Sequence, residues 1–510
     1  MLPLAFGTID WIVVGLYLVG VMAVGALFAR SKGQGDDDYF LAGRSMPGFA
    51  VTLSLLATSL SAATFIGAPN DAFNGNLTFL ILYLGNFLAV FIVAFVFVPR
   101  LYATGTTTIY GHLGRRYGPA AQRAAGATFI VGRLLASGAR LFMAATPLWL
   151  ILTDASRPLA EGRNELALCV VAVGTVGTLY TLMGGIRAVM WTDVLQLGLI
   201  FLAVAACVWV AFADVNLPVG EVVAKAEAAG KLTLLDLSLD LAKPYTLWTA
   251  LIGNTLFFAA IFGTDHDLAQ RFLTAKSAKS GMTSVILSQV IGMVVVALFM
   301  ALGLLLWVYY DGKPAEAGPL KGQPVFVLFI AKELPPVVAG LAVAGLFAAA
   351  QSSMDSATNA IAGSALHDVW RPDAQRDRAA KSGPSHLTTL GVGLALTATA
   401  VGCVYAFDPE APGGFLGFAL SIMAYAATGL MGVFLCAFFT RRGSAIGVVA
   451  AVVVAAAIML VPRLPALLPG ETVGDHWFFT VSFFWFVPVA VAASFATCCA
   501  FATRQQAEAL

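Results

Sequence analysis

Charged residues are scarce in this chain. Asp, Glu, Lys and Arg make up 11% of its 510 residues, whereas hydrophobic residues make up 59%. A soluble domain carries about 25% charged residues because its surface must be solvated. The scarcity therefore excludes a mainly water-exposed body and predicts a chain that is covered largely by lipid. The net charge of +1 also offers no basis for a nucleic-acid partner.

Several motifs that carry chemistry are missing as well. The six cysteines lie in apolar stretches without metal-ligand spacing, so we interpret them as buried, inert thiols. The five histidines lie in or near loops or helix ends, whereas a haem-bearing subunit needs histidines paired within helices. No phosphate-binding Gly-Lys-Ser loop and no helical His-Glu-x-x-His motif occurs. A primary pump, a haem protein and a membrane metalloprotease are therefore unsupported.

Long apolar runs are abundant. A membrane-spanning helix needs roughly 20 apolar residues at a rise of about 1.5 Å each. Thirteen stretches meet this length, so we predict an all-α integral membrane protein with a single polytopic domain over residues 1–510. The first stretch follows no basic segment and is too long for a signal peptide, so we expect it to be retained. The stretches are 8–30, 47–70, 77–100, 122–153, 165–184, 187–214, 246–265, 281–310, 336–366, 386–407, 414–440, 443–466 and 476–502.

The basic residues alternate between the predicted loops. With the N-terminus outside, 18 Lys and Arg residues fall in inner loops and on the tail, against 9 on the outer side. Arg271 belongs to the inner group, just after the stretch 246–265. Because cytoplasmic loops are enriched in Lys and Arg, we predict an outer N-terminus and a cytoplasmic C-terminus in the plasma (inner) membrane.

Two apolar stretches are unusually rich in oxygen. Thr58, Ser59, Ser61 and Thr64 crowd into the second stretch, and such hydroxyls compete for backbone hydrogen bonds. Where a helix is interrupted, freed carbonyls can bind Na⁺; alternatively, the hydroxyls bond back to their own helix.

The stretch 336–366 carries Ser352, Ser353, Asp355 and Ser356. Small-residue helix packing explains the alanines there but not a carboxylate, so we favour an alkali-ion site.

Besides Asp355, three charged residues within the predicted spans call for a partner or a function. Asp193 follows Arg187 by about 9 Å along its helix and is either a surface acid or part of an ion path. Arg133 lies roughly at mid-bilayer, whereas Arg140 is about 10 Å further and is expected to extend outward. We therefore favour Arg133 as a clamp for a substrate carboxylate, with a structural pair to a buried acid as the competing interpretation.

Taken in order, several segments resemble the sodium/solute symporter family, whose members include sodium-coupled sugar, proline, monocarboxylate and sialic-acid transporters. The resemblance implies a leucine-transporter-like inverted repeat of five plus five helices over about 47–214 and 246–440, with helices near 443–502 added. It also implies that the stretches 47–70 and 246–265 are broken. The matching segments are Asp38–Arg44, Ala57–Phe65, Tyr180–Gln196, Gln270–Arg271, Ala275–Ser277 and Ala348–Ser356.

The resemblance implies specific Na⁺ ligands. One site takes the carbonyls of Ala57, Leu60 and Ala349 and the hydroxyls of Ser352 and Ser353. A second site or exit path would use Ser352 with the acid and hydroxyl groups of three further residues: Asp193, Asp355 and Ser356. Position 355 is serine in the sialic-acid transporters, so its carboxylate either strengthens a second cation site or binds a proton.

The resemblance also suggests a solute pocket. The matching positions are Thr64, Tyr83, Asn86 and Arg133, and Asn254, Phe257 and Phe258 are further candidates for its wall. We expect Na⁺-driven symport of a small solute across the bilayer by alternating access, without enzyme activity, a cofactor or an obligatory protein partner. A carboxylate solute is favoured over a sugar or polyol. An uncoupled channel and a membrane sensor on the same fold are the competing functions.

Overall fold

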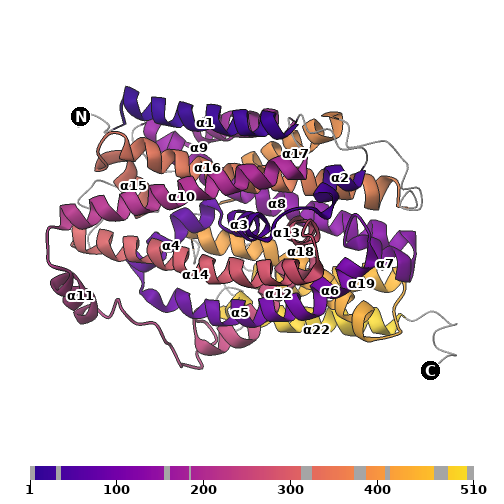
Figure 1. The fold of residues 1–510 in the computed structure, drawn as a ribbon. Coiled ribbons are helices and arrows are strands. Elements are labelled where there is room, and N and C mark those ends of the chain that lie inside the picture. Colours follow the sequence, from indigo (N-terminus) through magenta and orange to yellow (C-terminus); the bar gives the residue numbers. More distant parts are fainter. Residues whose placement is uncertain are drawn as a thin grey trace.

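The structure is a computed structural model, and it describes residues 6–29, 36–153, 161–182, 185–311, 324–372, 386–407, 414–463 and 480–501. Within these ranges the chain is helical and forms no β-strand. The long helices lie side by side in one bundle (Figure 1). Several basic residues predicted for the loops, such as Lys32, Arg157, Lys313 and Arg376, lie outside the described residues.

The helices follow the apolar stretches closely, because a run without charges can satisfy its backbone only internally in lipid. Short 3₁₀ or π segments adjoin several of them: Ala42–Arg44, Leu77–Ile81, Val93–Phe97, Thr249–Asn254, Ala365–Trp370 and Val461–Arg463. The helices are α1 (Thr8–Ala29), α2 (Asp36–Leu41), α3 (Gly48–Ser59), α4 (Ala62–Asn74), α5 (Leu82–Ile92), α6 (Val98–Thr104), α7 (Tyr110–Tyr117), α8 (Pro119–Leu152), α9 (Arg163–Thr181), α10 (Ile186–Val215), α11 (Val219–Ala228), α12 (Thr255–Thr264), α13 (His266–Leu273), α14 (Ala278–Tyr309), α15 (Val325–Lys332), α16 (Val338–Ser364), α17 (His386–Ala406), α18 (Gly414–Phe439), α19 (Ala445–Leu460) and α22 (Phe483–Ala500).

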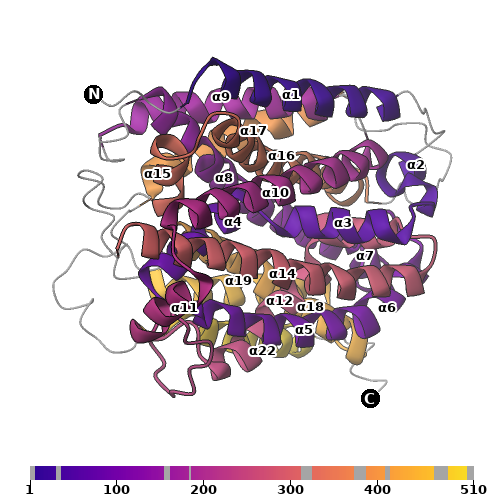
Figure 2. The same ribbon diagram turned by 60° about the vertical axis from the view of Figure 1, so that its left-hand side comes forward.

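Eight of the described helical spans are long and apolar enough to cross a membrane, and the pair α3–α4 would make a ninth. Their burial differs sharply, from 28% of the most apolar window of α1 to 89% of that of α8. α1 and α22 lie at opposite edges of the bundle, and α3 and α4 lie between α10 and α14 (Figures 1 and 2). The total of thirteen crossings and the orientation of the termini stay predictions.

Two helices are interrupted near the centre of the bundle. α3 ends at Ser59, Leu60 and Ser61 are extended, and α4 continues at an angle of 63°. The second interruption is at Asp265, whose extended backbone separates α12 from α13 and whose side chain accepts a hydrogen bond from the Asp267 N–H. Since a break leaves terminal carbonyls without helical donors, it exposes oxygen ligands inside the protein.

The second interruption also corrects a boundary. The stretch predicted to end at residue 265 continues as α13 to Leu273. Arg271, expected in an inner loop, is therefore fully buried. The error arose because the polar residues after Asp265 look like a loop when their partners are not known.

α1 is fastened to the centre by a buried carboxylate. Asp10 Oδ1 accepts hydrogen bonds from the N–H groups of Val337 and Gly340, each at 2.8 Å, where α16 begins. Its other oxygen accepts the Gly7 N–H. A carboxylate at a helix N-terminus satisfies free N–H groups and complements the helix dipole. Asp10 thus caps a helix more than 300 residues away in the sequence.

Replacing this carboxylate should destabilise the protein. We expect Asp10→Ala to lower the free energy of unfolding by about 1–3 kcal/mol, because it leaves buried N–H groups without acceptors. Thermal unfolding in detergent measures the effect. Asp10→Asn keeps one carbonyl oxygen and is the matched control, expected to lose less. Equal midpoints for Asp10→Ala and the wild type would contradict the capping role.

Candidate functional site

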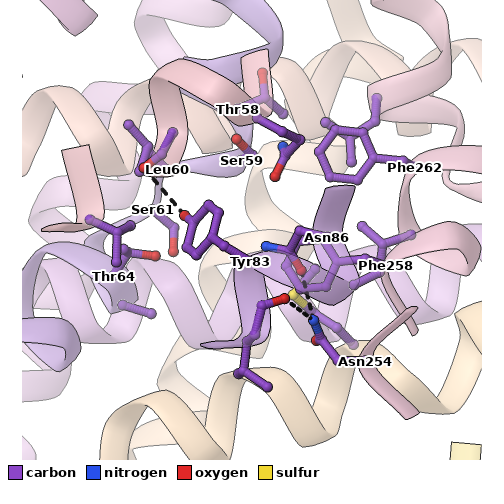
Figure 3. Close-up of a pocket in the computed structure, with 18 of the residues that line it drawn as sticks. Thr58, Ser59, Leu60, Ser61, Thr64, Tyr83, Asn86, Asn254, Phe258 and Phe262 are labelled. Atoms are coloured by element: carbon purple, nitrogen blue, oxygen red, sulfur yellow. Dashed lines mark hydrogen bonds between the residues drawn. The ribbon is translucent and has the colours of Figure 1, made fainter. Parts of the chain in front are cut away.

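An internal pocket lies beside the break between α3 and α4 (Figure 3). Its wall comes from seven helices, α3, α4, α5, α8, α12, α13 and α14, together with Met423 of α18, Phe79 of the 3₁₀ segment Leu77–Ile81 and Asn254 at the end of the π segment Thr249–Asn254. Figure 3 shows the hydroxyls of the break facing the side chains of α5 and α12. Phe257, one of the seven residues suggested for this pocket, is not among the residues that line it. The other six do line it: Thr64, Tyr83, Asn86, Arg133, Asn254 and Phe258.

One side of this pocket is a buried amide pair. Asn254 Nδ2 donates to Asn86 Oδ1 at 2.7 Å and to the Leu82 carbonyl at 2.8 Å. Asn254 Oδ1 has no partner among the described residues. Phe258 and Phe262 stack beside the pair, with ring centroids 6.1 Å apart. The wall therefore offers hydrogen-bonding groups next to an apolar surface, as expected for a small organic ligand.

Arg133 lines the pocket but is already engaged. Its Nη1 donates to Asp265 Oδ2 at 3.0 Å, and its Nη2 forms a short ion pair with Asp267. Both partners come from the break between α12 and α13. Arg133 was interpreted as either a substrate clamp or a structural partner of a buried acid. In the structure it pairs with two acids of the protein interior.

Arg140 contrasts with Arg133, although it lies two turns away on the same helix. It is 5% exposed and lines the pocket, whereas the sequence suggested an outward-extending side chain. Its Nη2 lies 3.2 Å from Met423 Sδ, and its Nη1 has no hydrogen-bond partner in the described part of the chain. No acid of that part forms an ion pair with it. The pocket therefore contains a desolvated guanidinium that is free to bind an anion.

A buried ion network connects the two broken helices. Arg271 of α13 donates to Asp267 Oδ1 at 2.7 Å, to Asp193 Oδ2 at 3.2 Å and to Ser54 Oγ at 3.0 Å. Ser54 also donates to Asp193 at 2.5 Å. Asp193, interpreted from the sequence as either a surface acid or part of an ion path, is thus fully buried and pairs with Arg271.

The sequence interpretation missed Asp265, Asp267 and Arg271 as site residues. A signal was present, because two acids and an arginine within seven residues directly follow an apolar helix. In such a position the charges need partners or water. Without the tertiary structure they read as a loop.

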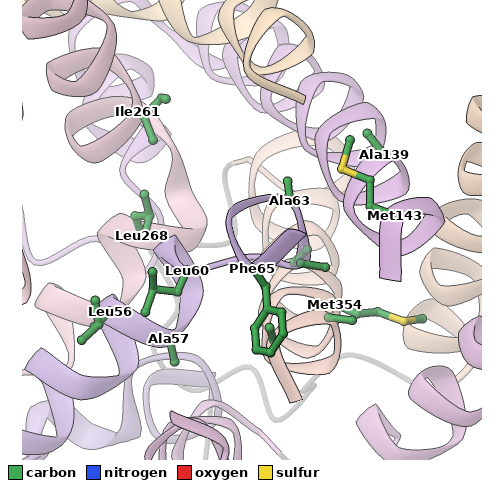
Figure 4. Packing of buried hydrophobic residues seen from close by; sticks show 14 of the residues in the cluster. Leu56, Ala57, Leu60, Ala63, Phe65, Ala139, Met143, Ile261, Leu268 and Met354 are labelled. Atoms are coloured by element: carbon green, nitrogen blue, oxygen red, sulfur yellow. The ribbon is translucent and has the colours of Figure 1, made fainter. Parts of the chain in front are cut away.

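Three of the five predicted Na⁺ ligands lie together where α3 packs against α16. Ser352 Oγ lies 3.1 Å from the Ala57 carbonyl and 3.5 Å from the Ala349 carbonyl. Ser353 Oγ is buried, and no described group accepts or donates a hydrogen bond to it. Ala57 lies near the end of α3, and Leu60 lies at the break itself (Figure 4). This set consists of neutral oxygens, which suit a hard alkali cation.

The second predicted set is more dispersed. Asp355 Oδ1 accepts a 2.6 Å hydrogen bond from Thr181 of α9, whereas Ser356 Oγ donates to Asp267 of α13 at 3.2 Å. Asp355 and Asp193 each keep one oxygen without a hydrogen-bond partner among the described residues. Asp355 also lacks an arginine partner in that part of the chain, unlike the acids at 193, 265 and 267.

Comparison with known proteins identifies the family. The profile of the sodium:solute symporter family matches residues 39–455, which is most of the chain. The chain belongs to the sodium:solute symporter family.

This symporter is similar to a human sodium/iodide cotransporter, with 28% identity over 91% of this chain and 71% of the relative. It is 30% identical to a sodium/sialic acid symporter of Aliivibrio fischeri, over 72% and 70% of the two chains. Its fold resembles the substrate-bound, outward-open structure of a Na⁺-coupled sialic acid symporter, with a TM-score of 0.76, 23% identity and 97% coverage of both chains. All three relatives are sodium-coupled transporters by name.

The two pocket arginines should respond oppositely to removal of their charge. Arg133→Met leaves Asp265 without its ionic partner and Asp267 with Arg271 alone, which should cost about 3–5 kcal/mol of stability. Arg140→Met removes a desolvated charge without an ion pair, so stability should stay within about 1 kcal/mol or increase. Thermal unfolding of the purified protein without solute compares the two. A larger loss for Arg140→Met would refute this assignment of the ion pairs.

Proposed function

We propose that this protein couples inward Na⁺ movement to the uptake of a small organic carboxylate by alternating access across the plasma (inner) membrane. The observation that carries the proposal is one junction: the oxygens of a broken helix meet α16 beside a pocket that contains the unpaired Arg140. The proposed cation ligands and the anion-binding Arg140 therefore lie beside the same helix break. We place the N-terminus outside and the C-terminus in the cytoplasm.

The proposed Na⁺ site consists of the carbonyls of Ala57, Leu60 and Ala349 and the hydroxyls of Ser352 and Ser353. Support comes from the contacts of Ser352 with two of these carbonyls and from the buried Ser353 Oγ, which has no partner among the described residues. Na⁺ bound here would join α3 and α4 to α16, and so hold the two sides of the pocket in one arrangement. We propose Asp193, Asp355 and Ser356 as a second cation site or as the exit path.

The proposed solute ligand is Arg140 rather than Arg133. Arg133 compensates Asp265 and Asp267, so a solute carboxylate would have to displace two ionic partners. Arg140 needs no displacement, and its planar guanidinium can hold a carboxylate through two parallel hydrogen bonds. The human and the Aliivibrio fischeri relatives are named for anions, iodide and sialic acid, which supports an anionic solute. Thr64, Tyr83, Asn86, Asn254 and Phe258 would contact the rest of the molecule.

Coupling follows if each ligand stabilises the arrangement that the other binds. Na⁺ orders the break whose hydroxyls line the pocket, and the solute bridges that break to α8 and α12. The coupling free energy must then be reciprocal: the solute raises Na⁺ affinity by the factor by which Na⁺ raises solute affinity. No covalent step is required.

Uptake into proteoliposomes tests the proposal directly. We expect an inward Na⁺ gradient to drive accumulation of one carboxylate from a panel of monocarboxylates, sialate, amino acids and neutral sugars.

Ser353→Ala should weaken apparent Na⁺ affinity roughly five- to 150-fold, because one oxygen ligand worth about 1–3 kcal/mol is lost. Ser494→Ala, another buried hydroxyl far from the site on α22, is the matched control. Unchanged Na⁺ affinity in Ser353→Ala would remove the site, and gradient-independent uptake would point to a channel.

The role of Arg140 has its own test. Arg140→Gln should raise the KM for the carboxylate by roughly ten- to 150-fold, because a charge-assisted hydrogen bond worth about 1.5–3 kcal/mol is lost. Arg140→Lys keeps the charge but not the planar pair of donors, so its KM should lie between that of the wild type and that of Arg140→Gln. Accumulation of a neutral sugar instead, indifferent to Arg140→Gln, would overturn the carboxylate assignment while leaving Na⁺ coupling intact.

A further inference from the structure

Three of the six cysteines meet at one end of the bundle. Cys436 lies near the end of α18, and Cys498 and Cys499 lie at the end of α22. Cys436 Sγ and Cys499 Sγ are 3.3 Å apart, although the residues are 63 positions apart in the sequence. The sequence suggested six isolated thiols, so this contact is a product of helix packing alone.

The two thiols differ in access to water. Cys436 is fully buried, whereas Cys499 is only partly buried. A small oxidant can therefore reach Cys499 first, while Cys436 is shielded behind it. An exposed thiol with a second thiol in contact is the arrangement of a redox-active pair, in which the second thiol resolves the oxidised first one.

Cys436 Sγ lies among polar groups: the Tyr117 hydroxyl donates to it, the Thr440 hydroxyl contacts it, and it donates to the Arg442 carbonyl at 3.5 Å. Tyr117 Oη lies 3.6 Å from it and Thr440 Oγ1 lies 3.4 Å from it. Hydrogen-bond donors around a sulfur stabilise its thiolate, which is the nucleophilic form. The surroundings of Cys436 are thus polar, in contrast to those of an inert core cysteine.

Two guanidinium groups bind backbone carbonyls next to these cysteines. The Arg116 guanidinium donates to the Thr440 carbonyl and lies 5.5 Å from the centre of the Tyr117 ring. Arg442 Nε donates to the Cys499 carbonyl at 2.9 Å. Two guanidinium groups within the cluster further favour a thiolate there.

We propose that Cys436 and Cys499 form a reversible disulfide in response to a peroxide, and that this end of the transporter is a thiol modification site. The Cys499 thiol loses its proton and attacks one peroxide oxygen, the O–O bond breaks, and the departing hydroxide takes up a proton to give water and a sulfenic acid. The Cys436 thiol then loses its proton and attacks the Cys499 sulfur, and the S–S bond forms as the sulfenic hydroxyl leaves with a proton as a second water. In sum, two thiols and one hydrogen peroxide give one disulfide and two waters.

The geometry requires only a small movement. A disulfide has an S–S distance of about 2.05 Å, so the sulfurs must approach by roughly 1 Å, within the range of side-chain rotation. The bond would fasten α18 to α22. Because α18 also carries Met423 against Arg140, the bond restrains a helix that lines the solute pocket.

Oxidation of the purified full-length protein tests the inference without a solute. After treatment with hydrogen peroxide, maleimide labelling under denaturing conditions should find four free thiols instead of six. Dithiothreitol should restore all six. Mass spectrometry of a non-reducing digest should find the Cys436–Cys499 cross-linked peptide.

Matched variants locate the bond. Cys498→Ser should still lose two thiols, whereas Cys436→Ser and Cys499→Ser should form no cross-link. The thermal unfolding midpoint should rise on oxidation in the wild type and in Cys498→Ser alone among these proteins. A Cys436–Cys498 cross-link, or Cys499 oxidised to sulfinic acid without any cross-link, would overturn the inference; both readings come from the wild-type digest and do not require the variants to fold.

Discussion

The arrangement of the centre depends on the buried guanidinium of Arg271. It holds Asp193 of α10, Asp267 of its own helix and Ser54 of α3. Through Asp267 the same network reaches Arg133 of α8 and Ser356 of α16. Five helices therefore converge on charges that have no access to bulk water. In a membrane protein apolar contacts between helices compete with equally apolar lipid, so satisfied polar contacts are what specify the packing.

The network also decides which charges remain available for ligands. Three arginines of the centre are buried, and the ion pairs of two of them consume the carboxylates of Asp193, Asp265 and Asp267. Arg140 and Asp355 are left without ionic partners among the described residues. Leaving an unpaired charge in a low-dielectric interior is costly, so such groups persist where a ligand completes them. A solute anion for Arg140 and a cation near Asp355 would each do so.

The peripheral contacts serve a different purpose. α1 and α22 lie at the edges of the bundle, yet each is tied to a more central helix by polar atoms (Figures 1 and 2). Asp10 caps α16, and the thiol of Cys499 contacts Cys436 on α18. These ties act on helices that carry the proposed Na⁺ ligands and part of the solute pocket. A chemical change at the edge of the bundle can therefore restrict or release the movement of α16 and α18.

Much of this protein was readable from the sequence by itself. Apolar runs of spanning length predicted the helices, because lipid leaves the backbone no other way to pair its groups. The crowded hydroxyls from Thr58 to Thr64 and the oxygens from Ser352 to Ser356 stood out against apolar neighbours, and the structure places both near one break. Local composition was sufficient for these features. Local composition could not predict how the charges pair. Arg133 and Arg140 look alike on one helix, and only tertiary packing places two aspartates beside Arg133 and none beside Arg140 in ion-pair contact. Arg271 likewise read as a loop residue, because its partners lie on helices far away in the sequence and electrostatic pairing depends on distance in space.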